Sequence, residues 1–324
     1  MIRSGFFNVV FLLFVVAGSM SCQQNDDIET EYTQISFHSY VDGKESPGYL
    51  SRGEIHENTT LNSRGKLIYT SSMYSSFGCW ASTYGITETW NEGSPINLMN
   101  NREIRQSASY ISNAYWPGAQ QKVKFFAYAP YGSAAISLLG NMNGYPTFDY
   151  TTPSEIVNQE DVLVASTMEY AGNFNKDVPL NFKHALTVIK FIDMGLPQGT
   201  VTKITLSGVY GKARHYVGKN VWDNHAELKD FVLQTNYKTS TVENSGTEIV
   251  DSNGNFIMIP QRLSEGAKLK IELQEINGST QEYTVSLANT EWIMGKMIKY
   301  NLSIDNKALI VVGDLTDWQD GGDL

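Results

Sequence analysis

The stretch KLKIELQEINGSTQEYTVSL, residues 268–287, shows which class of fold the chain adopts. Over Lys268–Leu273 apolar and polar residues alternate strictly, which predicts a strand with one buried face and one solvated face. A second strand is predicted over Gln281–Leu287. Between the two, Asn277-Gly278 supplies positive φ angles at low cost. The stretch therefore predicts an antiparallel β-hairpin.

Similar strand signals recur along the chain. Short segments rich in β-branched and aromatic residues are separated by turn residues, a pattern typical of strands. In Gln34–Val41, for example, Ile35, Phe37 and Val41 share one face. The other predicted strands are Lys122–Tyr128, Val162–Ser166, Val178–Phe182, Ala185–Phe191, Lys203–Val209, Asn255–Ile259 and Lys299–Ile304.

Turn dipeptides and the scarcity of helical periodicity favour an all-β fold. Asn253-Gly254 is the second-best hairpin turn, after Asn277-Gly278. Ala134–Asn141 and Glu155–Asp161 are the two segments that could form a short turn or helix. Short strands with turns between them indicate antiparallel β-sandwiches rather than a parallel α/β sheet.

Length and composition indicate a globular protein of two domains. The chain has 324 residues, of which 41% are hydrophobic, enough for a sizeable core. Strand signals are interrupted by Gly and Asn over Tyr170–Asp177. We therefore expect an N-terminal sandwich over residues 35–177 and a C-terminal sandwich over residues 178–324.

The net charge of −10 excludes two classes of partner. Nucleic-acid binding requires a basic surface, and so does adsorption to anionic lipid through a polybasic patch. We expect neither of these interactions.

The N-terminus resembles an export signal. Arg3 precedes an apolar run from Phe6 to Ala17, and small residues follow, which is the pattern of a secretory signal peptide. Cys22 after Gly-Ser-Met-Ser resembles a bacterial lipobox, although Ser19 stands where Leu is usual. We expect residues 1–21 to be the signal peptide, Cys22 to carry the lipid (diacylglycerol and palmitate), and residues 22–34 to form a tether.

Cysteine use agrees with this interpretation. The chain has two cysteines, Cys22 and Cys79. If lipid occupies Cys22, no intrachain disulfide can form. Because Phe77 and Trp80 flank Cys79 closely, we expect a buried thiol rather than a nucleophile.

No catalytic or cofactor motif stands out. The chain has no phosphate-binding loop, dinucleotide fingerprint or Gly-x-Ser-x-Gly elbow. Its five histidines lack metal-ligand spacing, so no metal or other cofactor is predicted. Glu160 and Asp161 are adjacent acids, but glycoside hydrolysis needs two carboxyls that converge across a sugar. Trp90, in a polar stretch, is the tryptophan best suited to contact a ligand.

An ordered set of segments resembles the fimbrillin family, the Mfa-like and FimA-like pilus proteins of Bacteroidales. The set extends over nearly the whole chain after the signal peptide. Its members are Ile35–Phe37, Ser63-Arg64-Gly65, Tyr115–Pro117, Val123–Tyr131, Gln159–Ala165, Val178–Leu186, Phe256–Gln261, Trp292–Tyr300 and the ending at Trp318.

The resemblance implies a fold, a location and a mode of assembly. It implies two transthyretin-like β-sandwich domains in a lipoprotein exposed on the outer membrane. It also implies that an arginine-specific protease cuts after Arg64 or Arg52 and removes the strand Ile35–Val41. Another fimbrillin subunit then fills the opened groove with a strand of its own. The chain departs from this pattern at its C-terminus, where only Lys307–Val312 could serve as the donated strand.

Two other functions stay open at this point. One is a surface lipoprotein that binds carbohydrate without polymerising, whereas a host or bacterial surface receptor is an expected partner of the pilus or adhesin subunit itself. The other is an extracellular hydrolase, which the absence of a catalytic constellation disfavours. We expect a structural subunit that is not an enzyme.

Overall fold

The computed structural model describes residues 33–42, 44–45, 59–61, 67–70, 74–105, 110–239, 246–250 and 254–318. The predicted lipidation site Cys22 and the predicted processing sites Arg52 and Arg64 lie outside these residues. In the described part of the chain, no helix is both long and apolar enough to cross a membrane.

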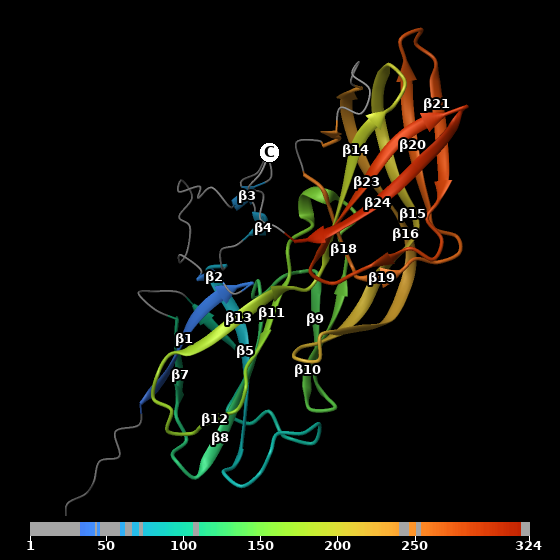
Figure 1. Ribbon diagram of the computed structural model, residues 1–324. Helices are drawn as coiled ribbons and strands as arrows, with labels where there is room; N and C mark the ends of the chain where they lie inside the picture. Colours follow the sequence, from blue (N-terminus) through green and yellow to red (C-terminus); the bar gives the residue numbers. More distant parts are fainter. Residues whose placement is uncertain are drawn as a thin grey trace, which may run out of the picture. The chain divides into compact units, whose positions relative to one another are not determined.

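The described residues are almost entirely β-strand, so the all-β prediction is confirmed (Figure 1). The largest sheet has the order β2-β1-β13-β11-β8-β5-β6, with β7 added on β1 and β12 added on β8. Its strands are β1 (Gln34–Val41), β2 (Lys44–Glu45), β5 (Ser76–Gly85), β6 (Met99–Arg105), β7 (Tyr110–Tyr115), β8 (Gln121–Ala129), β11 (Leu163–Ser166), β12 (Tyr170–Ala171) and β13 (Val178–His184).

The other strands form two further large sheets and two small ones. One large sheet, in the order β21-β20-β15-β10-β9 with β16 on β15, contains β9 (Ile136–Met142), β10 (Tyr145–Thr151), β15 (Gly199–Tyr216), β16 (Val221–Lys238), β20 (Lys268–Glu275) and β21 (Thr280–Ser286). The second, in the order β17-β14-β23-β24 with β18 on β14, contains β14 (Thr187–Gly195), β17 (Thr247–Glu248), β18 (Phe256–Met258), β23 (Lys296–Asp305) and β24 (Ala308–Asp317). The small pairs are β3 (Thr59–Leu61) with β4 (Leu67–Thr70) and β19 (Gln261–Arg262) with β22 (Glu291–Trp292), and Ile156–Asn158 forms the short 3₁₀ helix η1.

Strand β8 shows how the first sheet becomes buried on both faces. Val123, Phe125 and Ala127 point into one apolar cluster, whereas Phe126 and Tyr128 point into another. Successive side chains of a strand face opposite sides of the sheet, so an apolar run without polar alternation is expected where both faces are covered. The segment Lys122–Tyr128 therefore specifies a central strand.

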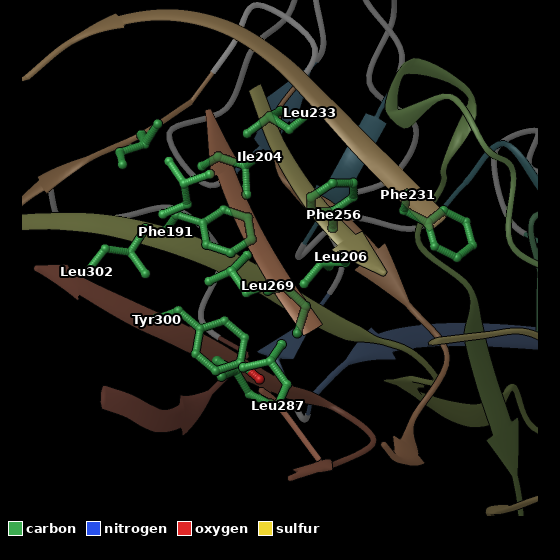
Figure 2. Close-up of a cluster of buried hydrophobic side chains, with 14 of the residues drawn as sticks. Phe191, Ile204, Leu206, Phe231, Leu233, Phe256, Leu269, Leu287, Tyr300 and Leu302 are labelled. Carbon is green, nitrogen blue, oxygen red and sulfur yellow. The ribbon is translucent and has the colours of Figure 1, made fainter. Parts of the chain in front are cut away.

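Three apolar cores organise the part of the chain that the structure describes. The N-terminal core lies on one face of the first sheet and contains Phe37, Phe77, Phe125 and Phe182. The C-terminal core lies between the two other large sheets. Figure 2 shows Phe191 of β14, Tyr300 of β23 and Leu269 of β20 within it. The junction core combines residues of all three large sheets, including Trp80, Phe148, Val188, Met297 and Trp318.

The hairpin predicted at Asn277-Gly278 is confirmed. β20 pairs antiparallel with β21, and the inward residues Leu269, Ile271 and Leu273 are fully buried. The other predicted strands also lie within or overlap observed strands, with β1 matching its predicted bounds.

One local prediction is wrong. Ala134–Asn141 is a turn followed by most of strand β9, because this segment pairs with β10 through a turn at Asn143 and Gly144, both with positive φ. The turn predicted at Asn253-Gly254 lies partly outside the described residues; the nearest described strands on either side of it, β17 and β18, each pair with β14. Glu155–Asp161 does contain a helical turn, η1.

Strand pairing crosses the predicted domain boundary in both directions. β13, from the predicted C-terminal domain, lies between β1 and β11 in the first sheet. β9 and β10, from the predicted N-terminal domain, extend the sheet that contains β15. The division at residues 177 and 178 stays a prediction, and the cores describe the packing more directly.

Candidate functional site

Strand β1 is an inner strand with neighbours on both edges. Along Phe37–Val41 it runs parallel to β13, with Ser39 opposite Leu180. On the other edge, Gln34–Phe37 pairs with β7, and Tyr40 and Val41 pair with β2. The backbone of β1 is therefore hydrogen bonded into the sheet along both edges, and its loss would expose the unpaired edges of β13 and β7.

Alternate side chains of β1 fill the N-terminal core. Ile35, Phe37 and Val41 are each at most 2% exposed. The Phe37 ring meets Phe77 and Phe125 edge-on, with ring centroids 5.7 and 5.5 Å apart. Burial of the three side chains contributes about 4–9 kcal/mol at about 1.5–3 kcal/mol each. Without β1 the core would contain an open apolar slot.

A cluster of charged side chains lies at the C-terminal end of β1. Asp42, the residue after the strand, donates its backbone N–H to the Phe182 carbonyl at 2.9 Å. Its carboxylate lies 3.2 Å from Nε2 of His184. On the other side of the ring, Nδ1 of His184 donates to Asp161 at 2.8 Å. His184 and Asp161 are almost fully buried, whereas the Asp42 side chain is 43% exposed.

The two carboxylates set the charge of His184. Burial alone would lower the pKa of His184, but the charge and hydrogen bond of Asp161, followed by those of Asp42, raise that pKa to about 10. At neutral pH the ring is therefore an imidazolium, hydrogen bonded through Nδ1 to Asp161 and ion-paired through Nε2 with Asp42. Asp42, Asp161 and His184 are brought together from the ends of three different segments of the first sheet.

The same histidine holds the end of the last described strand. The ring of Trp318 stacks on the ring of His184 with centroids 4.1 Å apart and an angle of 3° between the planes. Trp318 is 5% exposed and donates its backbone N–H to Gly295 at 3.3 Å. Stacking on an aromatic face is favourable for a cationic ring, so His184 and Trp318 stabilise one another.

Strand β24 is attached along one edge. It pairs antiparallel with β23 from Ala308 to Asp317. Most of its side chains face solvent, among them Ile310, Val312 and Leu315, which are 42%, 57% and 51% exposed. A long, exposed apolar strand at a sheet edge is a surface that readily pairs with another chain. The strand is longer than the predicted donor Lys307–Val312 and includes most of it.

Comparison with known proteins shows the family. The model of the fimbrillin-like family matches residues 76–318. The protein belongs to the fimbrillin-like family. Its proteins are structural components of fimbriae and adhesins, appendages of the cell surface, and not enzymes. The chain is 25% identical to the fimbrium subunit Fim1C of Phocaeicola vulgatus, over 82% of this chain and 88% of that protein.

Two crystal structures share the fold of this fimbrillin-like chain. A fimbrial protein from Bacteroides vulgatus aligns with a TM-score of 0.56 at 20% identity, over 76% of this chain and 94% of the other. A proposed cell adhesion protein from Bacteroides uniformis aligns with a TM-score of 0.53 at 14% identity, over 88% of this chain and 99% of the other. The predicted family and the predicted all-β fold class are thus confirmed.

The adjacent acids Glu160 and Asp161 do not converge on a common point. Asp161 is fully buried against His184, whereas Glu160 accepts a hydrogen bond from Ser133 at 2.5 Å. Both acids are bound by other side chains, as is usual for acids that hold a structure together.

Trp90 is half-buried in a cluster of rings. Its indole meets Tyr145 at 5.0 Å and Phe126 at 5.7 Å between centroids, and Lys124 Nζ lies 5.0 Å from the indole centroid. Its backbone N–H donates to Glu169 at 2.8 Å. The ligand contact expected at Trp90 stays a prediction.

The remaining reactive groups are internal. Cys79 is fully buried and free, and burial raises the pKa of its thiol well above the usual value. The predicted burial of Cys79 is thus confirmed. His215 is fully buried beside Phe148 and Trp222, and burial lowers its pKa to about 3. Among the described residues, no three His, Cys, Asp or Glu side chains form a group suited to a metal.

Proposed function

We propose that the protein is a surface-anchored pilus or adhesin subunit that assembles with other fimbrillin subunits by donor-strand exchange. The observation that carries this proposal is the inner position of β1. Its two paired edges and its three buried apolar side chains make it a strand whose removal creates a groove of defined shape. A strand from another subunit would restore the backbone hydrogen bonds along both edges and fill the apolar slot with its own side chains.

Proteolysis is the proposed trigger. Arg52 and Arg64 lie between β1 and β5 in the sequence. Arg64 falls between the paired strands β3 and β4. A cut after Arg64, or after Arg52, by an arginine-specific protease separates β1 covalently from the rest of the fold. The strand then remains only through non-covalent pairing and can be replaced.

The proposed donor is β24. It is ten residues long, begins with the apolar run Ala308–Val312 and pairs with only β23 among the described strands. Ile310 and Val312 lie on one face and Leu309, Val311 and Leu315 lie on the other, so either face offers side chains to a groove. A donated strand that buries three or four such side chains would gain about 5–12 kcal/mol at about 1.5–3 kcal/mol each.

The proposed location is the outer face of the outer membrane. The lipobox at Cys22 supports it, because a diacylated and palmitoylated N-terminus binds membranes stably. Receptor binding by a host or bacterial surface partner belongs to the same proposal, with Trp90 as its candidate contact. A glycan array with the native chain and Trp90→Ala tests that part: loss of binding in the variant supports it, and unchanged binding removes Trp90 from it.

Assembly is tested with an arginine-specific protease on the purified chain. Mass spectrometry should find a cut after Arg64 or Arg52, and size-exclusion chromatography should then show association. Matched variants Arg64→Lys and Arg52→Lys should each block their own cut, because such a protease does not accept lysine. A chain that is cut and stays monomeric, or that is never cut there, contradicts the proposal.

A further inference from the structure

Two strands with opposite roles in the proposed assembly end at the same buried side chain. β1 ends just before Asp42, which contacts Nε2 of His184. β24 ends just before Trp318, which stacks on the face of that ring. The two strands belong to different sheets (Figure 1), and no pairing between them is recorded among the described strands. His184 thus contacts the ends of both.

Trp318 matters to β24 because little else buries that strand. Along β24 only Leu309, near its beginning, is buried, and the residues from Val312 to Asp317 are exposed. Beyond the ladder to β23, the second half of the strand is supported by Asn301, which donates to Asp314 at 2.7 Å, by Lys296, which pairs with Asp317, and by Trp318. The hydrogen bond and the ion pair are both exposed to solvent, where such contacts contribute little to stability. Trp318 is therefore the main anchor of this end.

Asp42 matters to His184 because it fixes the second nitrogen of the ring. With Asp161 on Nδ1 and Asp42 on Nε2, the plane of the imidazolium is held at two points. If β1 leaves, the Asp42 carboxylate and its backbone N–H to Phe182 leave with it. The ring is then held by Asp161 alone, water gains access to Nε2, and the face on which Trp318 stacks is no longer fixed.

We propose that His184 couples the retention of β1 to the docking of β24, so that a subunit that loses β1 also loosens its own C-terminal strand. The biological role of this coupling rests on the proposed function: removal of β1, which opens the acceptor groove, would also free the donor strand β24 of the same subunit. An uncut subunit would keep both strands docked, which restrains assembly until processing. Coupling between two sites is reciprocal, so loosening Trp318 also loosens β1.

Hydrogen–deuterium exchange on the intact, uncut chain tests the coupling. Asp42→Asn removes the carboxylate charge that faces His184 Nε2. The amides of Leu315–Asp317 should then exchange roughly five- to tenfold faster, in the range of ordinary coupling energies. The control is Asp177→Asn, which removes another carboxylate that contacts β1, at Ser36. It should leave β24 unchanged. Equal exchange in native and Asp42→Asn chains, or equal acceleration in both variants, overturns the proposal.

Two further arms assign the effect to His184. In a His184→Gln background, Asp42→Asn should no longer change the exchange of β24. Conversely, Trp318→Leu should speed the exchange of backbone amides in Gln34–Val41. This variant also tests the coupling if Asp42→Asn does not fold. Persistence of the Asp42 effect without His184, or an unaltered β1 in Trp318→Leu, overturns the proposal. None of these arms uses cleavage, so a failure of processing or polymerisation would be seen separately.

Discussion

Phe37→Ala measures how much the inner strand contributes to the intact subunit. The ring is 2% exposed and meets two other rings edge-on. Burial of such a ring is worth about 1.5–3 kcal/mol, and each edge-on pair adds about 0.5–1.5 kcal/mol. Together these terms agree with the loss of about 3–5 kcal/mol seen when a buried phenylalanine is truncated. We expect a loss of that size in the free energy of unfolding.

Chemical denaturation of the intact chain, followed by circular dichroism, provides the assay. Ile111→Ala is the matched control, because Ile111 lies on the neighbouring strand β7, opposite Ser36, and is 46% exposed. Its effect should stay within about 0.5 kcal/mol. After protease has removed β1, native and Phe37→Ala chains should unfold alike, since residue 37 is gone from both. A loss below about 1 kcal/mol in the intact chain would refute the claim that β1 is an integral core strand.

Three further predictions concern buried groups. Asp161 and Asp42 raise the pKa of His184 from 6.5 in the unfolded chain to about 10, so the stability that His184 contributes is complete below pH 6.5 and is lost as pH rises through 10, by up to about 1.4 kcal/mol per pH unit. His184→Gln should flatten this slope in thermal melts between pH 7 and 10. An unaltered slope would exclude His184 as its source. The pH dependence expected from His215 has the opposite sign: burial lowers its pKa to about 3, so stability is lost as pH falls from 6.5 towards 3. His215→Phe should reduce this sensitivity to acid. Equal midpoints of acid unfolding in the native and variant chains would argue against a contribution from His215. In Trp292→Phe the buried Tyr300 hydroxyl loses the indole N–H that donates to it at 2.9 Å, so the free energy of unfolding should fall by about 1–3 kcal/mol. An unchanged free energy of unfolding would show that the hydroxyl finds another partner.

Local sequence signals were sufficient for strands with one solvated face. β20 and β21 could be predicted from alternation and from Asn277-Gly278, because each inward residue is separated from the next by an outward one. β5 was missed, because Phe77–Ala81 is buried on both faces and contains glycine and cysteine. β16 was missed, and β24 was predicted only in part, over Lys307–Val312, for the opposite reason. Both strands lie at sheet edges and are largely exposed, so burial imposes little pattern on them.

The charged cluster could not be predicted from the sequence. Asp42, Asp161, His184 and Trp318 come from four distant segments, and none of them stands in a motif with fixed spacing. Their meeting depends on the parallel register of β1 on β13 and on the return of β24 along β23. The only local signal is the dipeptide Asp42-Gly43, which is typical of turns with positive φ, and Asp42 has φ 47°.

Cross-linking inside the groove tests the central claim of strand replacement most directly. Leu180 on β13 is fully buried in the N-terminal core, opposite Ser39 of β1. With photo-leucine in place of leucine and a mixture of isotopically light and heavy chains, links from residue 180 can be assigned within or between subunits. Before cleavage they should reach Gln34–Val41 of the same chain, and after cleavage they should reach Ala308–Asp317 of another chain. Links that still reach β1 after cleavage, or that never join two chains, would contradict replacement of β1 by a donated strand.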